Sequence, residues 1–273
     1  LEEDLIDAES KIDCPGFFKL GRGKYRCWKK HGHGTLNLHD ALVQSCDVYF
    51  YTLGNRIGID TLADYAKKFG LGAPTGLGLN REKSGLVPTT QWKLKNRKER
   101  WLLGETISAS IGQGYNLVTP LQQANMMAAV SNGGILLKPY LVKRIEDPWG
   151  KVLEEFFPEI KGKIGGNSEN LEIIRKALRD VVNGPKGTGK KSKLKNIIVS
   201  GKTGTVQVVR MKTKKGLEKE NVPYKHRDHA WFVGFAPYEK PEIAVAVLVE
   251  HGGHGGATAA PIAKKIIKKY FQL

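Results

Sequence analysis

The chain has 273 residues, of which 40% are hydrophobic and 26% charged, a composition that excludes a disordered or low-complexity protein. Its net charge of +17 comes from 44 basic and 27 acidic residues, and it favours an anionic neighbour (nucleic acid, acidic lipid or an acidic polymer) no more than a solubilising lysine surface. No run of about 18 apolar residues occurs, so we expect no membrane span within the chain.

The first part of the chain predicts loops and short strands followed by helices. Residues 1–34 are rich in glycine, lysine and aromatic side chains. A helical pattern then runs over about 36–55, with an interruption near Ser45. Asp60 is typical of the N-cap of a helix, which should end before Gly70.

The middle of the chain alternates between glycine-rich and helical segments. Residues 70–88 predict irregular structure, 93–100 a charged surface segment, and 104–114 a glycine-bounded loop. Thr119-Pro120 then supplies an N-cap and a first-turn proline for a helix that closes at Gly133.

A strand and an amphipathic helix follow. Residues 138–144 predict the strand, and Ser168 predicts the cap of a helix whose apolar positions recur at helical spacing. The basic segment 184–191 predicts a flexible loop; its glycine spacing and the lack of a preceding strand exclude a phosphate-binding loop.

The last part of the chain predicts a sheet closed by a helix. Strand candidates cover 196–209, 230–236 and 242–250, and the turns between the last two suit an antiparallel meander. Residues 257–271 predict an amphipathic helix that packs on the sheet through Ile262, Ile266, Ile267 and Tyr270. We therefore expect an α/β (α+β) fold, mainly an antiparallel sheet flanked by helices.

The tetrapeptide Lys202-Thr203-Gly204-Thr205 lies on the first of these strands. A lysine supplies a cation, a threonine hydroxyl supplies a hydrogen bond, and a glycine lets a ligand approach the strand closely. Serine acyl-transfer enzymes that recognise penicillin bind a carboxylate in this way. The pattern also occurs in ordinary turns, so its neighbours decide its meaning.

The motifs occur in one particular order, which is Ser45-Cys46-Asp47, then Gly112-Gln113-Gly114 with Thr119-Pro120, then Lys202-Thr203-Gly204-Thr205. In this order the chain resembles the transpeptidase domain of class B penicillin-binding proteins, and within them the elongation-specific penicillin-binding protein 2 subgroup. Supporting stretches are Trp28–Gly34, Ser45–Tyr51, Ser84-Gly85, Pro88–Trp92, Arg227–His229 and Phe235–Pro237. The resemblance covers nearly the whole chain and implies a penicillin-binding, serine β-lactamase-like transpeptidase fold.

The Ser-x-x-Lys motif that carries the nucleophile in this family is absent from its expected place. The family's layout puts it upstream of Leu1, so we expect the chain to be part of a longer protein and inactive without that segment. Ser192-Lys-Leu-Lys195 matches the motif formally. It lies in a basic loop after the second motif, and we reject it. The fragment is predicted to be one domain, with loops in 1–47, a helical part in 48–195 and the sheet in 196–273.

The resemblance assigns roles to the remaining motifs. Ser45 would relay a proton to the leaving amine, with Asp47 beside it where many relatives have Asn. Lys202, Thr203 and Thr205 would bind the terminal carboxylate of a stem peptide or a β-lactam. The backbone N–H of Thr205 would form half of the oxyanion hole, and Gly204 would leave room for the ligand.

The cysteines predict a structural zinc site. Cys14, Cys27, His33 and Cys46 offer three thiolates and one imidazole, a donor set typical of closed tetrahedral zinc. The resemblance supports this, since relatives hold zinc at matching positions. A Cys14–Cys27 disulfide with a free Cys46 is the alternative, and His31 and His39 are rival ligands.

Two further segments invite a functional interpretation. His251-Gly-Gly-His254 resembles a metal motif, but we favour backbone that lines the site. The polar, basic segment 210–229 either guides an anionic glycan or partner or is a solvated loop.

The function predicted from the resemblance is a peptidoglycan D,D-transpeptidase of cell elongation, sensitive to β-lactams. Its expected partners are stem peptides, a SEDS-family glycosyltransferase and the elongation complex. Its expected location is the bacterial inner membrane, through a missing N-terminal anchor, with the domain in the periplasm. The alternatives are a β-lactamase or D,D-carboxypeptidase of the same fold, or a zinc-stabilised basic nucleic-acid module. No nucleic-acid recognition motif is present, so we expect no nucleic-acid partner.

Overall fold

The computed structural model describes residues 1–78, 80–208 and 222–273, and its largest sheet has three antiparallel strands in the order β11-β10-β9. These strands are β9 (Ser200–Val206), β10 (His229–Ala236) and β11 (Ile243–Val249). The predicted antiparallel sheet is confirmed, and β9, which carries the Lys-Thr-Gly motif, lies at the edge of this sheet.

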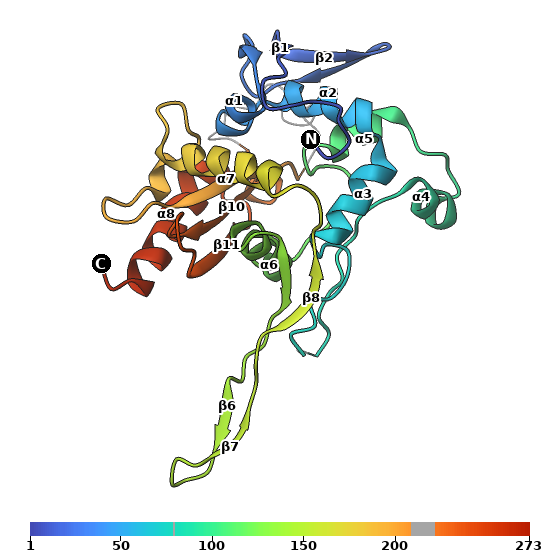
Figure 1. Ribbon diagram of the computed structural model, residues 1–273. Coiled ribbons are helices and arrows are strands. Elements are labelled where there is room, and N and C mark those ends of the chain that lie inside the picture. Colours follow the sequence, from blue (N-terminus) through green and yellow to red (C-terminus); the bar gives the residue numbers. More distant parts are fainter. Residues whose placement is uncertain (79, 209–221) are drawn as a thin grey trace.

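Helices cover both faces of the sheet (Figure 1). Successive side chains of a strand point to opposite faces. On β10, Ala230 and Phe232 join a cluster with α8 (Gly255–Tyr270). Phe235 joins a different cluster with α6 (Pro120–Ser131) and α7 (Ser168–Asn183). The sheet is therefore the middle layer between α8 and the other two helices.

The buried face of α8 differs from the predicted one. It consists of Ala259, Ala260, Ala263 and Ile267, all fully buried. Of the predicted face only Ile267 is buried. Ile262, Ile266 and Tyr270 are 38%, 43% and 50% exposed, so they do not join the core as expected. Small alanine side chains let the helix lie close to the strands. The helix therefore turns its alanine residues toward the sheet and leaves the larger side chains of Ile262 and Ile266 partly exposed.

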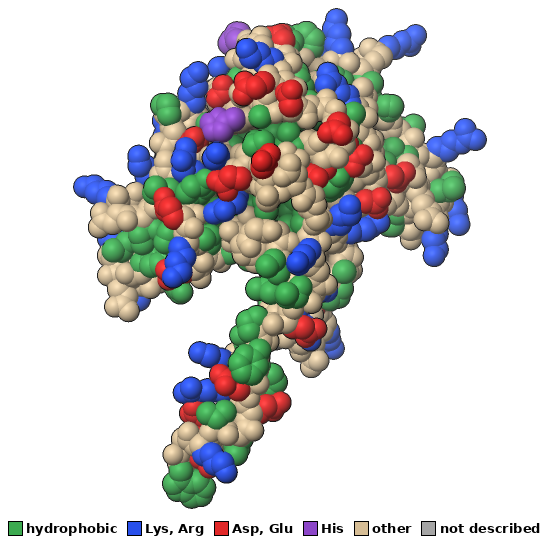
Figure 2. Space-filling view, in the orientation of Figure 1, with side chains coloured by type: hydrophobic (Ala, Val, Ile, Leu, Met, Phe, Trp, Pro, Cys, Tyr) green, Lys and Arg blue, Asp and Glu red, His purple; other side chains and the backbone are tan. Residues whose placement is uncertain are grey.

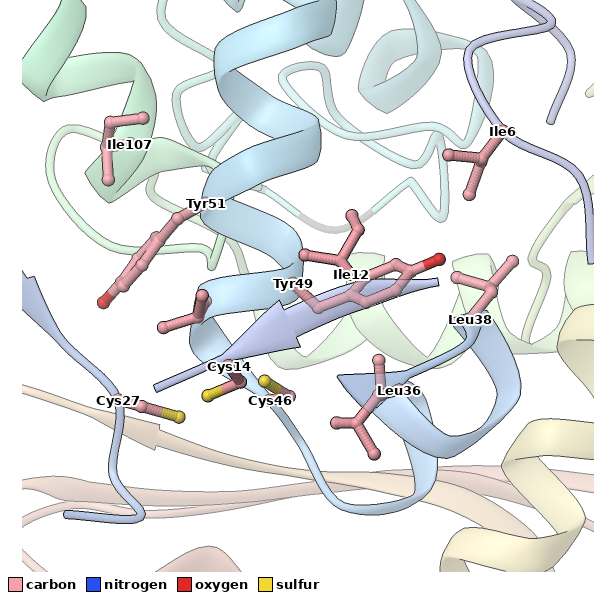
Figure 3. Close-up of a cluster of buried hydrophobic side chains, with 12 residues drawn as sticks. Ile6, Ile12, Cys14, Cys27, Leu36, Leu38, Cys46, Tyr49, Tyr51 and Ile107 are labelled. Carbon is pink, nitrogen blue, oxygen red and sulfur yellow. The ribbon is translucent and has the colours of Figure 1, made fainter. Parts of the chain in front are cut away.

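The first 57 residues form a small subdomain of short strands and helices, and Ile107 from further along the chain completes its core. The strands β1 (Ile12–Cys14) and β4 (Gly34–Leu36) pair, as do β2 (Phe17–Leu20) and β3 (Gly23–Arg26). The helices α1 (Leu38–Val43) and α2 (Asp47–Ile57) follow, with the predicted interruption between them. The three cysteines lie in the core beneath α2 (Figure 3).

Several predicted boundaries were wrong for local reasons. The helix α3 (Ile59–Lys68) is capped by Gly58, while Asp60 accepts hydrogen bonds from Thr90 at 2.9 and 2.7 Å. The segment predicted as a glycine-bounded loop contains the helix α5 (Leu103–Ala109), because Glu105 caps its first turn. The cap of α7 is Asn167, one residue before Ser168.

The charged segment 93–100 is also not wholly exposed, because it overlaps the helix α4 (Thr90–Arg97). Lys93 on this helix has 2% of its side chain exposed and is buried against α5 through Glu105. By contrast, the helix predicted after Thr119-Pro120 is confirmed as α6, with Thr119 as its N-cap.

A long two-stranded arm projects from the body (Figure 1). Its base is β5 (Ile135–Lys138) paired with β8 (Glu159–Lys163), and its outer part is β6 (Arg144–Glu146) paired with β7 (Val152–Glu155). The predicted strand 138–144 is wrong: only its end residues, Lys138 and Arg144, belong to β5 and β6, and residues 139–143 between them form no strand. Trp149 at the tip is 89% exposed, and further apolar side chains lie on the surface of the arm (Figure 2).

Across the described residues, no helix combines the length and the apolar character that a membrane span requires.

Candidate functional site

The structure brings Ser45 and Lys202 together. Ser45 lies in the turn between α1 and α2 with a left-handed backbone, φ 53°. Lys202 lies on β9, and its Nζ donates to Ser45 Oγ at 2.8 Å across 157 residues of sequence. The two motifs therefore form one site, as the predicted relay requires.

Lys202 is held in partly buried surroundings. Its Nζ also donates to the Thr203 carbonyl at 3.0 Å. Burial lowers the pKa of Lys202 to about 8, and the nearby Asp47 carboxylate opposes this change. The ammonium and the neutral amine are thus both accessible near neutral pH.

The open edge of β9 is lined by side chains from two other segments. Gln113, from the predicted Gly-Gln-Gly motif, donates through Nε2 to the Thr205 carbonyl at 3.1 Å and accepts from Gln207 N at 3.3 Å. Thr203 Oγ1 donates to Thr188 Oγ1 at 3.1 Å. The two threonine hydroxyls thus lie side by side next to the motif.

The backbone of Thr205 points to this open edge. Within an antiparallel strand, the N–H and C=O of one residue point to the same side. Since Gln113 binds the carbonyl of Thr205 from outside the sheet, the N–H of Thr205 faces the same way. Its hydroxyl accepts from Gly255 N at 3.4 Å. This arrangement is compatible with the predicted oxyanion donor.

Gly204 and Gly255 let α8 begin directly against β9. A Cβ on Gly255 would lie 2.3 Å from the Gly204 carbonyl oxygen, so a side chain at position 255 would push the helix off the strand. A Cβ on Gly204 would lie 3.2 Å from Trp231 on the neighbouring strand β10.

Asp47 faces the N-terminal loops rather than the lysine directly. Its Oδ2 accepts from the backbone N–H of Trp28 at 2.8 Å. Burial and the negative charge of Cys27 raise the pKa of Asp47 to about 7. Asp47 also starts α2, where a negative charge is favourable.

Helix α7 links the two halves of the site. His39 on α1 lies 3.1 Å from the carboxylate of Asp180 on α7, and Asn183 Nδ2 donates to the Val199 carbonyl next to β9 at 2.8 Å. The helix α7 therefore contacts both α1, which leads into Ser45, and the residue before β9, which carries Lys202. These contacts fix the position of the two segments relative to each other.

The four predicted metal ligands also come together. The ligand atoms of Cys14, Cys27, His33 and Cys46 all lie within 4.8 Å of one another. His33 Nδ1 lies 3.6 Å from Cys14 Sγ and 3.5 Å from Cys27 Sγ. A tetrahedron with zinc–sulfur and zinc–nitrogen bonds of about 2.3 and 2.1 Å has edges of about 3.6 Å. The donor set fits a zinc ion.

The alternatives to this ligand set do not form. All three cysteines are free, so the disulfide is absent. His31 is exposed, and His39 is engaged by Asp180. Burial lowers the pKa of His33, which favours the neutral imidazole that binds metals.

The other predicted candidates take structural places. Ser192 is fully buried, and its hydroxyl donates to the Gly189 carbonyl at 2.8 Å, which removes it as a nucleophile. His251 Nδ1 lies 3.1 Å from the Arg227 carbonyl, and neither His251 nor His254 joins a metal-like group among the described residues. Of the segment 210–229, residues up to 221 lie outside the described residues.

Sequence reasoning missed two contributors to the site, Trp28 and Thr188. Trp28 belongs to a stretch that supports the resemblance, and it directly follows the candidate ligand Cys27. Thr188 lies in the basic loop, which we interpreted as flexible. Neither carries a motif of its own, since each contributes through contacts made in the folded chain.

Comparisons with known proteins agree with this geometry. A family model described as "Penicillin binding protein transpeptidase domain" matches residues 1–268. The peptidoglycan D,D-transpeptidase MrdA of Acinetobacter baumannii is 40% identical over 97% of this chain and 39% of its own length. That of Haemophilus influenzae is 38% identical, over 98% and 42%. The chain thus spans about two fifths of these curated relatives.

Solved structures show the same fold. PBP2 of Pseudomonas aeruginosa superposes with a TM-score of 0.84 at 35% identity, over 98% of this chain and 55% of that one. PBP2 of Helicobacter pylori, solved in complex with MreC, superposes with a TM-score of 0.81 at 33% identity, over 98% and 46%.

Proposed function

Because the chain belongs to the penicillin-binding protein transpeptidase domain family, we propose that it is the catalytic domain of a serine-type peptidoglycan D,D-transpeptidase of cell elongation. One observation carries the proposal: the 2.8 Å contact between Lys202 Nζ and Ser45 Oγ at the open edge of β9. The relatives named peptidoglycan D,D-transpeptidase support it. The nucleophilic serine and its lysine would belong to the remainder of the longer protein.

In the first step the stem peptide would bind along β9. Its terminal carboxylate would accept hydrogen bonds from Thr203 and Thr205 and pair with the Lys202 ammonium. The oxygen of the scissile D-Ala-D-Ala carbonyl would then accept a hydrogen bond from the backbone N–H of Thr205, which points to that edge. The peptide adds a strand to the sheet edge, a mode in which backbone hydrogen bonds supply affinity.

In the second step a serine Oγ attacks the carbonyl carbon, and the C–N bond to the last D-Ala breaks. The serine proton leaves with the D-Ala amine, and Ser45 would relay it because it hydrogen bonds to Lys202. An amine on the stem peptide of a neighbouring peptidoglycan strand would then attack the acyl-enzyme. This step would restore the serine hydroxyl and form the cross-link. A β-lactam would follow the first half of this sequence and stay attached.

The zinc site belongs to the same proposal. Zinc would bind Cys14, Cys27, His33 and Cys46, and it would supply rigidity rather than chemistry. The support is the 4.8 Å cluster of donor atoms and the neutral form of His33. Cys46 lies between Ser45 and Asp47, so the metal would tie the relay turn to β1 and to Cys27, which follows β3.

We also propose the cellular setting. The longer protein would be anchored in the inner membrane with this domain in the periplasm. It would work with a SEDS-family glycosyltransferase and other members of the elongation complex. The complex of the Helicobacter pylori relative with MreC supports the part of this proposal that places the longer protein in an assembly.

Covalent labelling with fluorescent penicillin tests the function. The complete protein should be labelled at a serine outside this chain and should release D-Ala from a pentapeptide. Lys202→Ala and Ser45→Ala should each lower the labelling rate at least about ten-fold, in line with lost charge-assisted binding and proton relay. Labelling that persists at the parental rate in both variants contradicts the proposal.

A further inference from the structure

Trp28 makes three hydrogen bonds to the turn that carries Ser45. Its indole Nε1 donates to the Ser45 carbonyl at 2.8 Å and to the Gln44 carbonyl at 3.1 Å. Its backbone N–H donates to Asp47 Oδ2 at 2.8 Å. The side chain is nevertheless 61% exposed. An exposed tryptophan that satisfies two neighbouring carbonyls covers the turn from its outer side.

The turn needs such support, because Ser45 has a left-handed backbone with φ 53°. A non-glycine residue in this region carries strain, and it persists only where its surroundings hold it. From inside, Ser45 N and Cys46 N bond to the carbonyls of Leu42 and Ala41 at 3.2 and 2.9 Å. From outside, the indole of Trp28 holds the Ser45 carbonyl.

We propose that Trp28 is a positioning residue for the relay serine. Its indole N–H fixes the peptide plane that follows Ser45, and this plane sets the direction in which Oγ meets Lys202. The inference rests on the proposed function and adds a residue to it. Loss of the N–H would free two carbonyls and let the turn leave the strained conformation. Binding through the Lys202 motif would not change.

The first experiment replaces the indole by a ring without a donor. In the complete protein, Trp28→Phe should lower the acylation rate constant for a fluorescent penicillin about ten-fold. The dissociation constant of the preceding non-covalent complex should stay within about two-fold. Trp101→Phe is the matched control, since it also removes a 2.8 Å indole hydrogen bond, to Thr106, away from the site. A parental rate for Trp28→Phe overturns the inference.

A double-mutant cycle separates positioning from general destabilisation. If Trp28 acts through the Ser45 hydroxyl, Trp28→Phe has no further effect once Ser45 is alanine. The rate of the double variant should therefore equal that of Ser45→Ala. If the ten-fold loss recurs in the Ser45→Ala background, Trp28 does not act through Ser45.

Two further measurements, amide hydrogen exchange and metal content, test the role of Trp28 without relying on enzyme activity. Amide hydrogen exchange of residues 41–51 should be faster in Trp28→Phe than in the parent, and unchanged exchange overturns the inference. This readout decides the role of Trp28 even if the parent is never labelled, a result that defeats the proposed function alone. Metal content is measured alongside. A variant that loses metal and matches the metal-free parent assigns the effect to the ligand cluster and overturns the positioning role.

Discussion

Lys202 is both a candidate ligand-binding residue and a group with an altered pKa. It lies on an edge strand, contacts Ser45 and the Thr203 carbonyl, and has a pKa lowered by burial to about 8. An ammonium with a lowered pKa is less stabilised in the fold than in water. A bound carboxylate would compensate for this loss, so ligand binding and protonation should favour each other.

The pKa of Lys202 predicts the direction of a pH effect. Acylation of the complete protein by a carboxylate-bearing β-lactam should fall as the pH rises through about 8, because the ammonium is lost above this pKa. Lys202→Arg should be slower at neutral pH but flat through this range, since arginine stays charged up to a pKa above about 12. Stopped-flow acylation rates across this range check both profiles. A flat parental profile contradicts the prediction.

Lys93 is a charged residue with a purely structural place. Its Nζ donates to Glu105 at 2.6 Å and to the Arg100 carbonyl at 3.1 Å, which staples α4 to α5. Lys93→Ala should lower the free energy of unfolding more than a substitution of an exposed lysine does, because it leaves the carboxylate of Glu105 without its charged partner. Denaturant unfolding checks this difference. The exposed Lys95 on the same helix is the control, and Lys95→Ala should change stability by less than about 0.5 kcal/mol.

Among the elements, α8 lies unusually close to the strand β9, which carries Lys202. Its first residue, Gly255, lies against Gly204, and its alanine stripe packs on the clusters of β10 and β11. The larger apolar side chains on the other side remain partly exposed. The strand that carries Lys202 is thus supported by close backbone packing rather than by large side chains.

The packing of α8 predicts that substitutions on its buried face destabilise the protein more than substitutions on its exposed face. Ala263→Leu should destabilise the protein by about 1–3 kcal/mol, since a larger side chain has no space against the sheet. Ile266→Ala should cost less than about 1 kcal/mol, because this position is 43% exposed. Thermal unfolding of the two variants checks the order. Equal shifts in Tm would show that the helix does not pack as described.

At the scale of the whole molecule, the N-terminal subdomain meets the sheet where Ser45 contacts Lys202. The cysteine cluster brings the N-terminal loops together next to Ser45, and α7 links α1 to the residue before β9. We therefore expect a change in the N-terminal loops to affect the contact between Ser45 and Lys202.

Zinc removal should test this connection. Stripping zinc from the complete protein should disorder residues 10–47 and slow β-lactam acylation, although the metal would not touch the ligand. Hydrogen exchange and labelling rates before and after chelation provide the measurement, and restoring zinc should restore the rate. An unchanged acylation rate after verified metal removal contradicts the prediction.

The amino-acid order by itself determined the family, the three-stranded meander, the helix after Thr119-Pro120 and the four candidate metal ligands. These features depend on hydrophobic periodicity, capping residues and motif order, which can be read directly from the amino-acid sequence. The loop predicted at 104–114 was wrong over 104–109, and of the predicted apolar face of the last helix only Ile267 is buried, because tertiary packing overrides local propensity there.

Only the tertiary structure decided which side chains share the site. Ser45 and Lys202 are separated by 157 residues, and no local pattern states that Trp28 caps the turn between them or that Gln113 and Thr188 line the strand. Such contacts arise from the packing of distant segments, since hydrogen bonds of this kind form only after the chain has brought their partners together.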